Sequence, residues 1–542
     1  MYQPNLSMSY FSAHRHAGSD GADILDITDG GLLRDIAASH PSAVAMVDVS
    51  DNGDCGQAWT YAELLSEAEQ LALSLSTRYA PGERVVVWAP NSPQWIFMEY
   101  ACALAGLVLV TANPAFQASE LAYVLKQSGA VGLFRVDTFR GNPMADIAQE
   151  ATRENDTLRE AVNLDDAHAL HATGARPAEL PPVKPDDAAQ IQYTSGTTGF
   201  PKGAVLSHKN LVNNARLFCA RKQVGAHSVW ANFMPLFHTA GCATGALGCL
   251  QAACKMLLIK RFDADVLARL IEEQGVTTCF AVPTMLFNLL ESLERSPRDM
   301  SSLEVITTGG APVPPNLVRR VRDRLGCHLL SAFGQTEHSP MICLNPVEAT
   351  LDQIVETAGP PLPHTEVSIR SPEDNQVLPI GEVGEICACS YAVMIGYNDN
   401  PEATSAAIDA EGWLHTGDLG TMDAQGFVRV TGRVKDMIIR GGENHFPAEI
   451  EAVLVAHPAI AQVAVVGLPD EKWGEVIAAF ILSDSAPEVD DLRTHCRAHL
   501  SAQKTPTVWV KVPTFPLTGS GKVQKFAIRE QYLAGGYGEM MQ

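Results

Sequence analysis

Hydrophobic and polar positions follow two alternating patterns over much of the chain. Short apolar runs rich in β-branched residues predict strands, and they are followed by stretches in which apolar positions recur with the helical period of about 3.6 residues. Such alternation is typical of parallel-sheet α/β layers. The predicted strands span 84–89, 107–111, 255–259, 277–282 and 305–308, and the predicted helices span 94–106, 263–274 and 284–293.

The pattern changes beyond Arg433, where strands and helices no longer alternate in the same way. The elements predicted there are a helix over 447–456, strands over 460–466 and 476–482, and a helix over 490–500. A segment of about a hundred residues is the size of a compact domain, here of α+β type. We therefore place a domain boundary near Lys435, between a large domain of residues 1–434 and a small domain of residues 435–542.

Length and charge narrow the functional classes. At 542 residues the chain is too long for one ordinary core, and a prior of roughly 150 residues per domain predicts roughly three or four structural units. The 39 basic and 62 acidic residues give a net charge of −23, which argues against a broad basic surface for nucleic acid. A polyanionic ligand must therefore find a local basic pocket.

Cysteine spacing and apolar stretches bear on the compartment. The 12 cysteines contain no CxxC pair, the closest approach being Cys387 and Cys389, so they predict neither a disulfide framework nor a metal cluster. The first ten residues lack a basic region followed by an apolar one, which favours a cytoplasmic protein. The apolar stretch 241–259 carries Gln251 and Lys255, so a buried element is favoured over an integral membrane segment.

The segment Y-T-S-G-T-T-G-F-P-K-G, from Tyr193 to Gly203, combines flexible glycines, hydroxyl groups and one lysine. Glycines let the backbone approach a polyphosphate closely, while hydroxyls and lysine supply donors and charge. The order of lysine and hydroxyl excludes a Walker A loop, which needs G-K followed by Ser or Thr. Taken alone, the segment is also explained by an ordinary mobile turn. The residues that give it phosphate-binding character are Thr194, Ser195, Gly196, Thr197, Thr198, Gly199 and Lys202.

Further segments change the balance between these two readings. They are T-T-G-G-A-P ending at Pro312, S-A-F-G-Q-T-E over 331–337, G-W-L-H-T-G-D-L-G over 412–420, R-G-G-E-N-H-F-P over 440–447 and P-L-T-G-S-G-K over 516–522. Together with the phosphate loop they resemble the signature of the adenylate-forming superfamily, which contains acyl-CoA synthetases, adenylation domains and luciferases. The resemblance covers nearly the whole chain. It implies an α/β fold in which a large N-terminal domain of layered sheets carries a small, mobile α+β C-terminal domain.

The resemblance implies a site for ATP and Mg²⁺. Glu337 would hold the metal, because magnesium prefers oxygen ligands, and Thr336 would contact the α-phosphate. Asp418 would bind the ribose with support from Arg433, and Lys522 would complete the adenylation site. The neighbours that the resemblance assigns to adenine and the nearby phosphates are Gly310, Ala311, Pro312, Phe333, Gly334 and Gln335. Phe333 stands where the family commonly has tyrosine, so stacking is retained but a phenol hydrogen bond is not.

The small domain would supply the second half of the chemistry. In the acyl-CoA synthetases the R-G-G-E turn lines the path of CoA, and Lys435 corresponds to the hinge about which the small domain rotates. The residues assigned to CoA in this way are Arg440, Gly441, Gly442, Glu443 and Trp473. His445 departs from the family at a position that is more often aliphatic.

The segment M-P-L-F-H-T-A-G, from Met234 to Gly241, bears on the substrate. In the acyl-CoA branch His238 would lie beside the substrate carboxylate, although a lone histidine is more often structural. Amino-acid-activating relatives commonly place an aspartate here, whereas this chain has Phe237 and His238. An apolar pocket without that acid rejects a buried ammonium group by several kcal/mol. A medium- or long-chain fatty acid is the first choice and an aryl-alkanoic acid the second.

The sequence therefore predicts an AMP-forming ligase that joins a small-molecule carboxylic acid to CoA through an acyl adenylate. An acyl-AMP ligase that loads a carrier protein is one alternative, and the R-G-G-E-N turn favours CoA over it. A non-catalytic nucleotide-binding homologue is another, against which the retained chemical groups argue. The oligomeric state stays open, a homodimer included.

Overall fold

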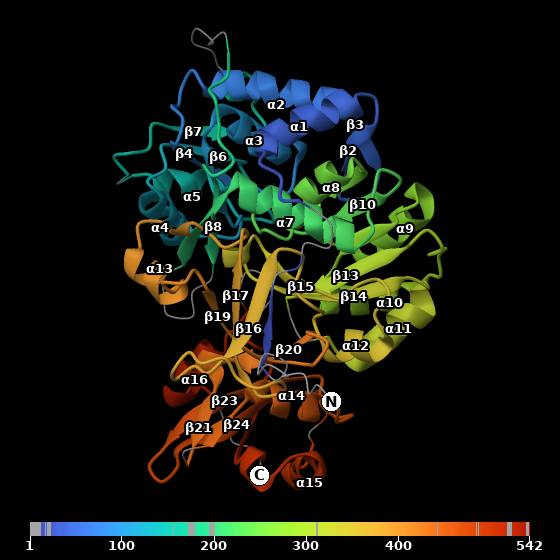
Figure 1. The fold of residues 1–542 in the computed structure, drawn as a ribbon, viewed down its shortest axis with the longest axis vertical. Coiled ribbons are helices and arrows are strands. Elements are labelled where there is room, and N and C mark those ends of the chain that lie inside the picture. The colour runs from blue at the N-terminus through green and yellow to red at the C-terminus, as the bar shows by residue number, and fades with distance from the viewer. Residues whose placement is uncertain are drawn as a thin grey trace, which may run out of the picture.

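The computed structural model describes residues 12–16, 18, 23–153, 155–171, 179–194, 201–310, 313–441, 443–483, 485, 487–517, 523–537 and 541. A large N-terminal domain and a small C-terminal domain lie one above the other in Figure 1. The large domain contains two broad sheets with helices packed on them, and a third sheet lies between these layers and the small domain. The predicted fold class is confirmed.

The first broad sheet has seven strands in the order β18-β9-β8-β5-β4-β6-β7. Its strands are β18 (Gly396–Tyr397), β9 (Lys202–Ser207), β8 (Ala188–Thr194), β5 (Val108–Ala112), β4 (Arg84–Trp88), β6 (Gly132–Arg135) and β7 (Glu160–Asn163). The strands from β8 to β7 are parallel, whereas β9 and β18 are antiparallel to their neighbours. The associated helices are α3 (Pro93–Ala105), α4 (Ala118–Ser128), α5 (Met144–Ala151) and α6 (Ala167–Leu170).

The second broad sheet has eight strands in the order β15-β14-β13-β12-β10-β11-β2-β3, parallel except at its two edges. Its strands are β15 (Met341–Leu344), β14 (His328–Gly334), β13 (Val305–Gly309), β12 (Thr278–Phe280), β10 (Val229–Asn232), β11 (Lys255–Ile259), β2 (Val44–Val49) and β3 (Cys55–Thr60). The helices of this half are α1 (Asp29–Ser39), α2 (Tyr61–Leu75), α7 (His208–Arg221), α8 (Gly248–Ala252), α9 (Ala264–Gln274), α10 (Pro283–Arg295), α11 (Pro315–Leu325) and α12 (Leu351–Glu356). One continuous apolar core joins both broad sheets.

The predicted α/β elements of the large domain are confirmed, with small shifts at their ends. The helix predicted over 263–274 starts at Ala264 because Asp263 caps it, accepting hydrogen bonds from the amides of Asp265 and Val266. The apolar stretch 241–259 forms a π-helix (Cys242–Leu247), α8 and β11, which are buried except at a few positions. Within the part of the chain that is described, no helix combines the length and the apolar character needed to cross a membrane.

The third sheet is antiparallel throughout, and the sequence pattern did not predict it. Its order is β1-β16-β17-β19-β20, with β1 (His14–Arg15), β16 (Thr365–Arg370), β17 (Gly384–Ser390), β19 (Leu414–Met422) and β20 (Val428–Arg433). One face packs on a separate apolar cluster that includes Ala13, Val367 and Ile386. The helix α13 (Pro401–Ala407) precedes β19. Through the pairing of β1 with β16, this sheet brings His14 and Arg15 next to residues 365–433.

The small domain is the predicted compact α+β unit. Its sheet contains β21 (Ile438–Arg440), β22 (Glu443–His445), β23 (Gln462–Asp470), β24 (Gly474–Leu482) and β25 (Val508–Lys511), and its helices are α14 (Pro447–Val455), α15 (Val489–His499) and α16 (Lys525–Leu533). Apolar clusters lie on both faces of this sheet, one around Ile450 and Leu492 and the other around Phe480 and Ile528. The sequence missed β21 and β22, which precede the helix at Pro447 as a hairpin rather than as a simple turn.

A lysine is buried in the large-domain core at the end of α7. Lys222 is 1% exposed, and its Nζ lies 4.1 Å from the ring centroid of Trp230 and 5.1 Å from that of Phe218. Burial lowers the pKa of its ammonium group from 10.5 to about 8. The folded protein therefore bears a free-energy cost for the charge below pH 8, and this cost disappears as the pH rises towards 10.5.

We expect Lys222→Met to stabilise the fold by about 1–3 kcal/mol below pH 8, because the loss of the charge outweighs the loss of the cation–π contacts. The advantage should shrink between pH 8 and 10.5, where Lys222 loses its proton in the folded state while the unfolded state still holds it. Chemical denaturation of both proteins across this range measures it. Lys126→Met on the exposed side of α4 is the control without such a trend, and a variant less stable than the native chain at every pH would contradict the expectation.

Candidate functional site

The ends of the phosphate loop are fixed by a β-hairpin. Thr194 at the end of β8 pairs with Lys202 at the start of β9, and the Thr194 hydroxyl donates to the Lys202 carbonyl at 3.4 Å. Lys202 thus belongs to a strand and not to the loop itself, which corrects the sequence interpretation. The predicted loop residues Ser195, Gly196, Thr197, Thr198 and Gly199 lie outside the described residues.

Tyr397 connects this hairpin to the carboxylate proposed for the metal. Strand β18 pairs with β9, placing Tyr397 opposite Ala204. The Tyr397 hydroxyl donates to Oε1 of Glu337 at 2.7 Å, and Nζ of Lys202 lies 4.9 Å from the centroid of the Tyr397 ring. Burial and the neighbouring Glu337 carboxylate raise the pKa of the Tyr397 hydroxyl, so it keeps its proton. The sequence missed Tyr397; its signal was an apolar run closing on an aromatic residue before the turn-forming Asn398.

Thr336 and Glu337 lie in a short 3₁₀ turn (Thr336–His338) that His338 holds in place. The His338 ring is fully buried, its Nδ1 lies 3.0 Å from the Met341 carbonyl, and its Nε2 lies 2.8 Å from the Ser390 hydroxyl. A neutral ring satisfies both contacts, with Nδ1–H as donor and Nε2 as acceptor. Burial lowers the pKa of His338 to about 4, which agrees with the neutral form. Sequence reasoning did not single out His338.

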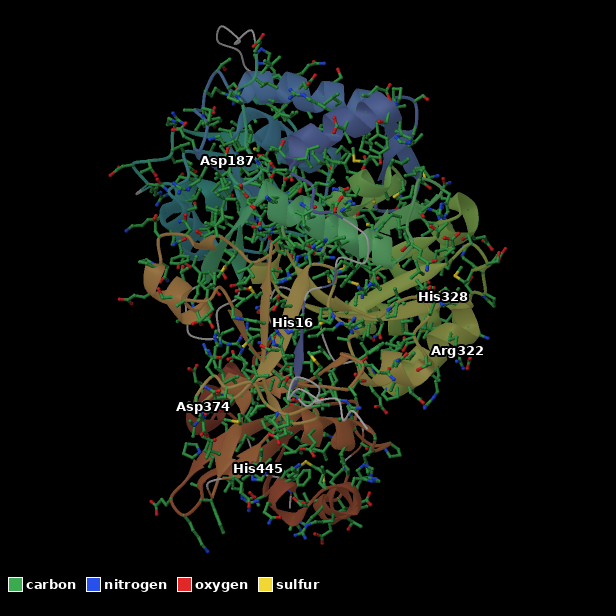
Figure 2. The ribbon with its side chains drawn as sticks, in the orientation of Figure 1. His16, Asp187, Arg322, His328, Asp374 and His445 are labelled. Carbon is green, nitrogen blue, oxygen red and sulfur yellow. The ribbon has the colours of Figure 1, made fainter. Side chains whose placement is uncertain are left out.

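Gly310 and Gly334 lie at the carboxyl ends of the parallel strands β13 and β14, where α/β sheets commonly bind ligands. Strand β14 starts at His328, which Figure 2 labels on the outer side of the large domain, and ends at Gly334. A Cβ on Gly334 would lie 2.1 Å from the Pro340 carbonyl oxygen, so the close backbone approach requires glycine. The motif segment 331–337 starts inside a strand, since β14 contains Ser331 to Gly334.

The structure describes two of the other adenine candidates, Phe333 and Gln335. Phe333 is 8% exposed and packs in the apolar cluster beneath the third sheet, so at most its edge reaches the surface. Gln335 is half-buried, and its backbone amide donates to the Pro340 carbonyl at 2.9 Å. Ala311 and Pro312 lie outside the described residues.

The turn that carries His238 is held by buried polar side chains from neighbouring strands and loops. The Thr111 hydroxyl on β5 donates to the Phe237 carbonyl at 2.8 Å, and Asn91 Oδ1 accepts from the Leu236 amide at 2.8 Å. Nδ1 of His238 accepts from the Ala240 amide at 3.1 Å, so Nε2 carries the proton of the neutral ring. Phe237 and His238 are both half-buried. The turn thus presents an aromatic face and an imidazole in a fixed orientation, as a carboxylate-binding role requires.

Asp418 and Arg433 face each other across the third sheet. They are directly opposite in the pairing of β19 with β20, and Nε of Arg433 donates to Oδ1 of Asp418 at 3.1 Å. The Asp418 side chain is 14% exposed, so it lies in the interior of a strand and not in an exposed turn. This ion pair holds the Asp418 carboxylate, a hydrogen-bond acceptor, at a partly accessible position. Lys435 follows in a short 3₁₀ turn (Val434–Asp436) between the third sheet and β21.

Arg440 and Glu443, two of the predicted CoA residues, pair in the β21–β22 hairpin of the small domain, and Trp473, just before β24, packs against it. Gly441 has φ +63°, its amide donates to the Trp473 carbonyl at 2.8 Å, and a Cβ there would lie 3.0 Å from the Trp473 ring. The Arg440 guanidinium lies 5.6 Å from the centroid of that ring, and Glu443 is exposed. Gly442 and Lys522 lie outside the described residues.

His445, labelled in the small domain in Figure 2, is an unusual feature of this hairpin. It is 2% exposed, and neither ring nitrogen has a hydrogen-bond partner within the described part of the chain. Burial lowers its pKa. Its Nε2 lies 4.0 Å from Oε2 of Glu443, so the buried ring is near charged groups although it forms no hydrogen bond with them.

The structure thus brings Lys202, Glu337 and Tyr397 together as one polar group, with Thr336 in the same turn as Glu337. Asp418 with Arg433 form a second group, and Arg440, Gly441 and Trp473 form a third in the small domain. A hydroxyl and a carboxylate in the first group are oxygen donors of the kind that suits Mg²⁺. A cation, an oriented phenol and a carboxylate beside a glycine-rich hairpin can together hold a polyphosphate with its metal.

Comparisons with known proteins agree with this geometry. The AMP-binding enzyme family model matches residues 33–398, and the model of the AMP-binding enzyme C-terminal domain matches residues 449–522. YngI of Bacillus subtilis (strain 168), named as an acyl-CoA synthetase, is 36% identical over 94% of this chain and 98% of its own length. The human mitochondrial medium-chain acyl-CoA ligase ACSF2 is 35% identical, covering 93% of this chain and 87% of the relative.

A solved structure shares the whole architecture. The o-succinylbenzoate CoA synthetase MenE from Bacillus subtilis, in complex with the acyl-adenylate intermediate OSB-AMP, superposes with a TM-score of 0.82 at 28% identity, over 93% of this chain and 98% of that one. MenE has also been solved with ATP and magnesium ion. Both parts of the chain match, and the relatives are matched over nearly their full length. The chain therefore belongs to the adenylate-forming superfamily of AMP-binding enzymes, in its acyl-CoA synthetase branch.

Proposed function

We propose that this acyl-CoA synthetase activates a hydrophobic carboxylic acid, with a medium- or long-chain fatty acid as first choice and an aryl-alkanoic acid as second. The observation that carries the proposal is the His238 turn, where Phe237 and a neutral imidazole stand in place of an acid that could hold an ammonium group. Two relatives support the two substrate classes by name, the medium-chain ligase ACSF2 and the o-succinylbenzoate synthetase MenE.

In the first step the substrate carboxylate attacks the α-phosphorus of ATP, and the bond from that phosphorus to the β-phosphate oxygen breaks. The hairpin ending at Thr194 and Lys202 holds the departing pyrophosphate, and Lys522 stabilises the charge that shifts in the transition state. Glu337, oriented by Tyr397, would hold Mg²⁺, which when bound neutralises phosphate charge. Asp418 binds the ribose hydroxyls while Arg433 holds its carboxylate in position.

In the second step the thiol of CoA loses its proton and attacks the acyl carbon, and the bond to AMP breaks. We propose that the small domain, residues 435–542, rotates about Lys435 between the steps. The rotation withdraws Lys522 and brings Arg440, Gly441, Gly442, Glu443 and Trp473 towards the adenylate. A hinge of this kind lets one domain present two surfaces in turn.

A panel of acids, assayed for AMP and thioester formation with ATP, Mg²⁺ and CoA, tests the substrate proposal. We expect medium- or long-chain fatty acids to give the highest kcat/KM, because binding in the pocket removes their apolar tail from water, which is favourable. Amino acids should give no product, since their ammonium group would be buried without a partner. Adenylate formation with transfer only to a carrier protein would favour the acyl-AMP ligase alternative, and ATP binding without pyrophosphate release would favour a non-catalytic homologue.

Tyr397→Phe should lower the rate of pyrophosphate release by about tenfold and raise the Mg²⁺ concentration needed for half-maximal rate, because Glu337 loses its hydrogen-bond donor. Initial rates over a magnesium series measure both effects. Tyr79→Phe is the matched control, since Tyr79 also donates to a glutamate, Glu160, elsewhere in the large domain. An unchanged magnesium dependence in Tyr397→Phe would remove the orienting role.

The two half-reactions should respond to different residues. Lys522→Ala should slow adenylate formation by about 10²–10³ while leaving the reaction of a supplied acyl adenylate with CoA much less affected. Gly441→Ala should do the reverse, because its Cβ would press on the Trp473 ring. Gly535→Ala, another positive-φ glycine of the small domain but in open space, controls for backbone strain. Equal loss of both half-reactions in either variant would contradict the division of roles.

A further inference from the structure

A cluster of two imidazoles and one carboxylate lies on the third sheet, apart from the residues assigned to ATP and CoA. Strand β1 pairs with β16 so that His14 lies opposite Ser368 and Arg15 opposite Val367. Continuing this register places His16 opposite Glu366. Because side chains alternate between the faces of a strand, His14, His16 and Glu366 share one face, while Ala13 points into the core on the other.

The spacing of the donor atoms matches a metal centre. Nε2 of His14 lies 3.2 Å from Oε2 of Glu366, and Nδ1 of His16 lies 3.7 Å from the same oxygen. The three donor atoms all lie within 4.8 Å of one another. Tetrahedral zinc with bonds of about 2.0–2.1 Å separates its ligand atoms by roughly 3.3 Å. The donors therefore need only small movements to surround one ion.

The surroundings restrain His14 and leave His16 accessible. The His14 ring meets the Trp413 ring edge-on at 5.5 Å, and Trp413 in turn stacks under the Arg370 guanidinium at 4.2 Å. The His14 and Glu366 side chains are 22% and 33% exposed, whereas His16 is 77% exposed. Two partly buried ligands, the His14 imidazole and the Glu366 carboxylate, and one exposed imidazole, that of His16, form an open site that an ion can enter from solvent.

A neighbouring cluster on the same sheet is less suited to a metal. Glu385, Cys387 and His415 also bring three donor types together. However, Nδ1 of His415 already lies 2.8 Å from Glu385, and its Nε2 lies 3.5 Å from Asp409, so both ring nitrogens are engaged by carboxylates. The Cys387 thiol is fully buried, and burial raises its pKa, which disfavours the thiolate that binds metals.

We propose that His14, His16 and Glu366 bind a divalent d-block ion, zinc by preference, and that this ion fastens the N-terminal strand to the third sheet. Imidazole and carboxylate donors suit zinc, whereas magnesium and calcium prefer oxygen donors alone. Cysteine spacing gives no sign of this site, because its donors are not thiols and His14 and Glu366 are 352 positions apart. Three protein ligands leave the fourth position of the ion to water.

Zinc titration of the full chain, prepared without an affinity tag and freed of metal by chelation, tests this proposal. Isothermal titration calorimetry should show one saturable site, and zinc should raise the melting temperature. His16→Ala and Glu366→Gln should each weaken binding by more than the roughly 10–100-fold that is typical of losing a group that only orients a ligand. The exposed position of His16 makes its replacement compatible with folding, so lost binding is not lost structure.

Two matched variants keep the result specific. His227→Ala removes an exposed histidine that likewise lies near a glutamate, Nε2 to Glu304 at 3.6 Å, and should bind zinc as the native chain does. His415→Asn tests the neighbouring cluster and should also bind normally. The proposal is overturned if the native chain shows no saturable site, if His16→Ala and Glu366→Gln bind as tightly as the native chain, or if His415→Asn abolishes binding. If the native chain shows no saturable site, His14, His16 and Glu366 form only a surface cluster of ion pairs.

Discussion

The arrangement of the nucleotide site depends on strand β9, which is hydrogen-bonded on both sides. On one side it pairs with β8 and so closes the phosphate hairpin, and on the other it pairs with β18 and so fixes Tyr397. The second pairing places Tyr397, on β18, between Lys202 and the 3₁₀ turn that carries Glu337. A single antiparallel strand, β9, therefore sets the distance between the Glu337 carboxylate and Lys202 at the end of the predicted phosphate loop.

Buried polar side chains also hold the turn that carries His238 in place. Asn91 donates to the carbonyls of Met234 and Ile259, which ties the His238 turn to the end of β11. Beneath this turn, Gln192 donates to Gln190, which donates to Glu99, and burial raises the pKa of Glu99 to about 8. A carboxyl group kept largely neutral at physiological pH adds little charge beneath the turn that carries His238.

The sequence predicts the elements whose signal is local, and it fails where structure arises from distant pairing. The repeated strand and helix patterns and the Asp263 cap are local, and the corresponding elements are present. The antiparallel third sheet joins β1 to β16 across most of the chain, so no window of sequence contains its pattern. Among the candidate site residues, motifs predict Glu337 and Asp418, whereas Tyr397 and His338 become candidates only through the partners that folding gives them.

The burial of Ala13 has a consequence for handling the protein. Ala13 is wholly inaccessible, its amide bonds to the Leu378 carbonyl, and its carbonyl accepts from Ile369. The N-terminal strand thereby covers what would otherwise be the open edge of β16. Removing residues through Arg15, and with them β1, would expose unpaired amides and carbonyls of β16 beside an apolar face, a combination that recruits strands from other molecules. A shortened chain would accordingly aggregate through this edge even with every nucleotide-binding residue intact.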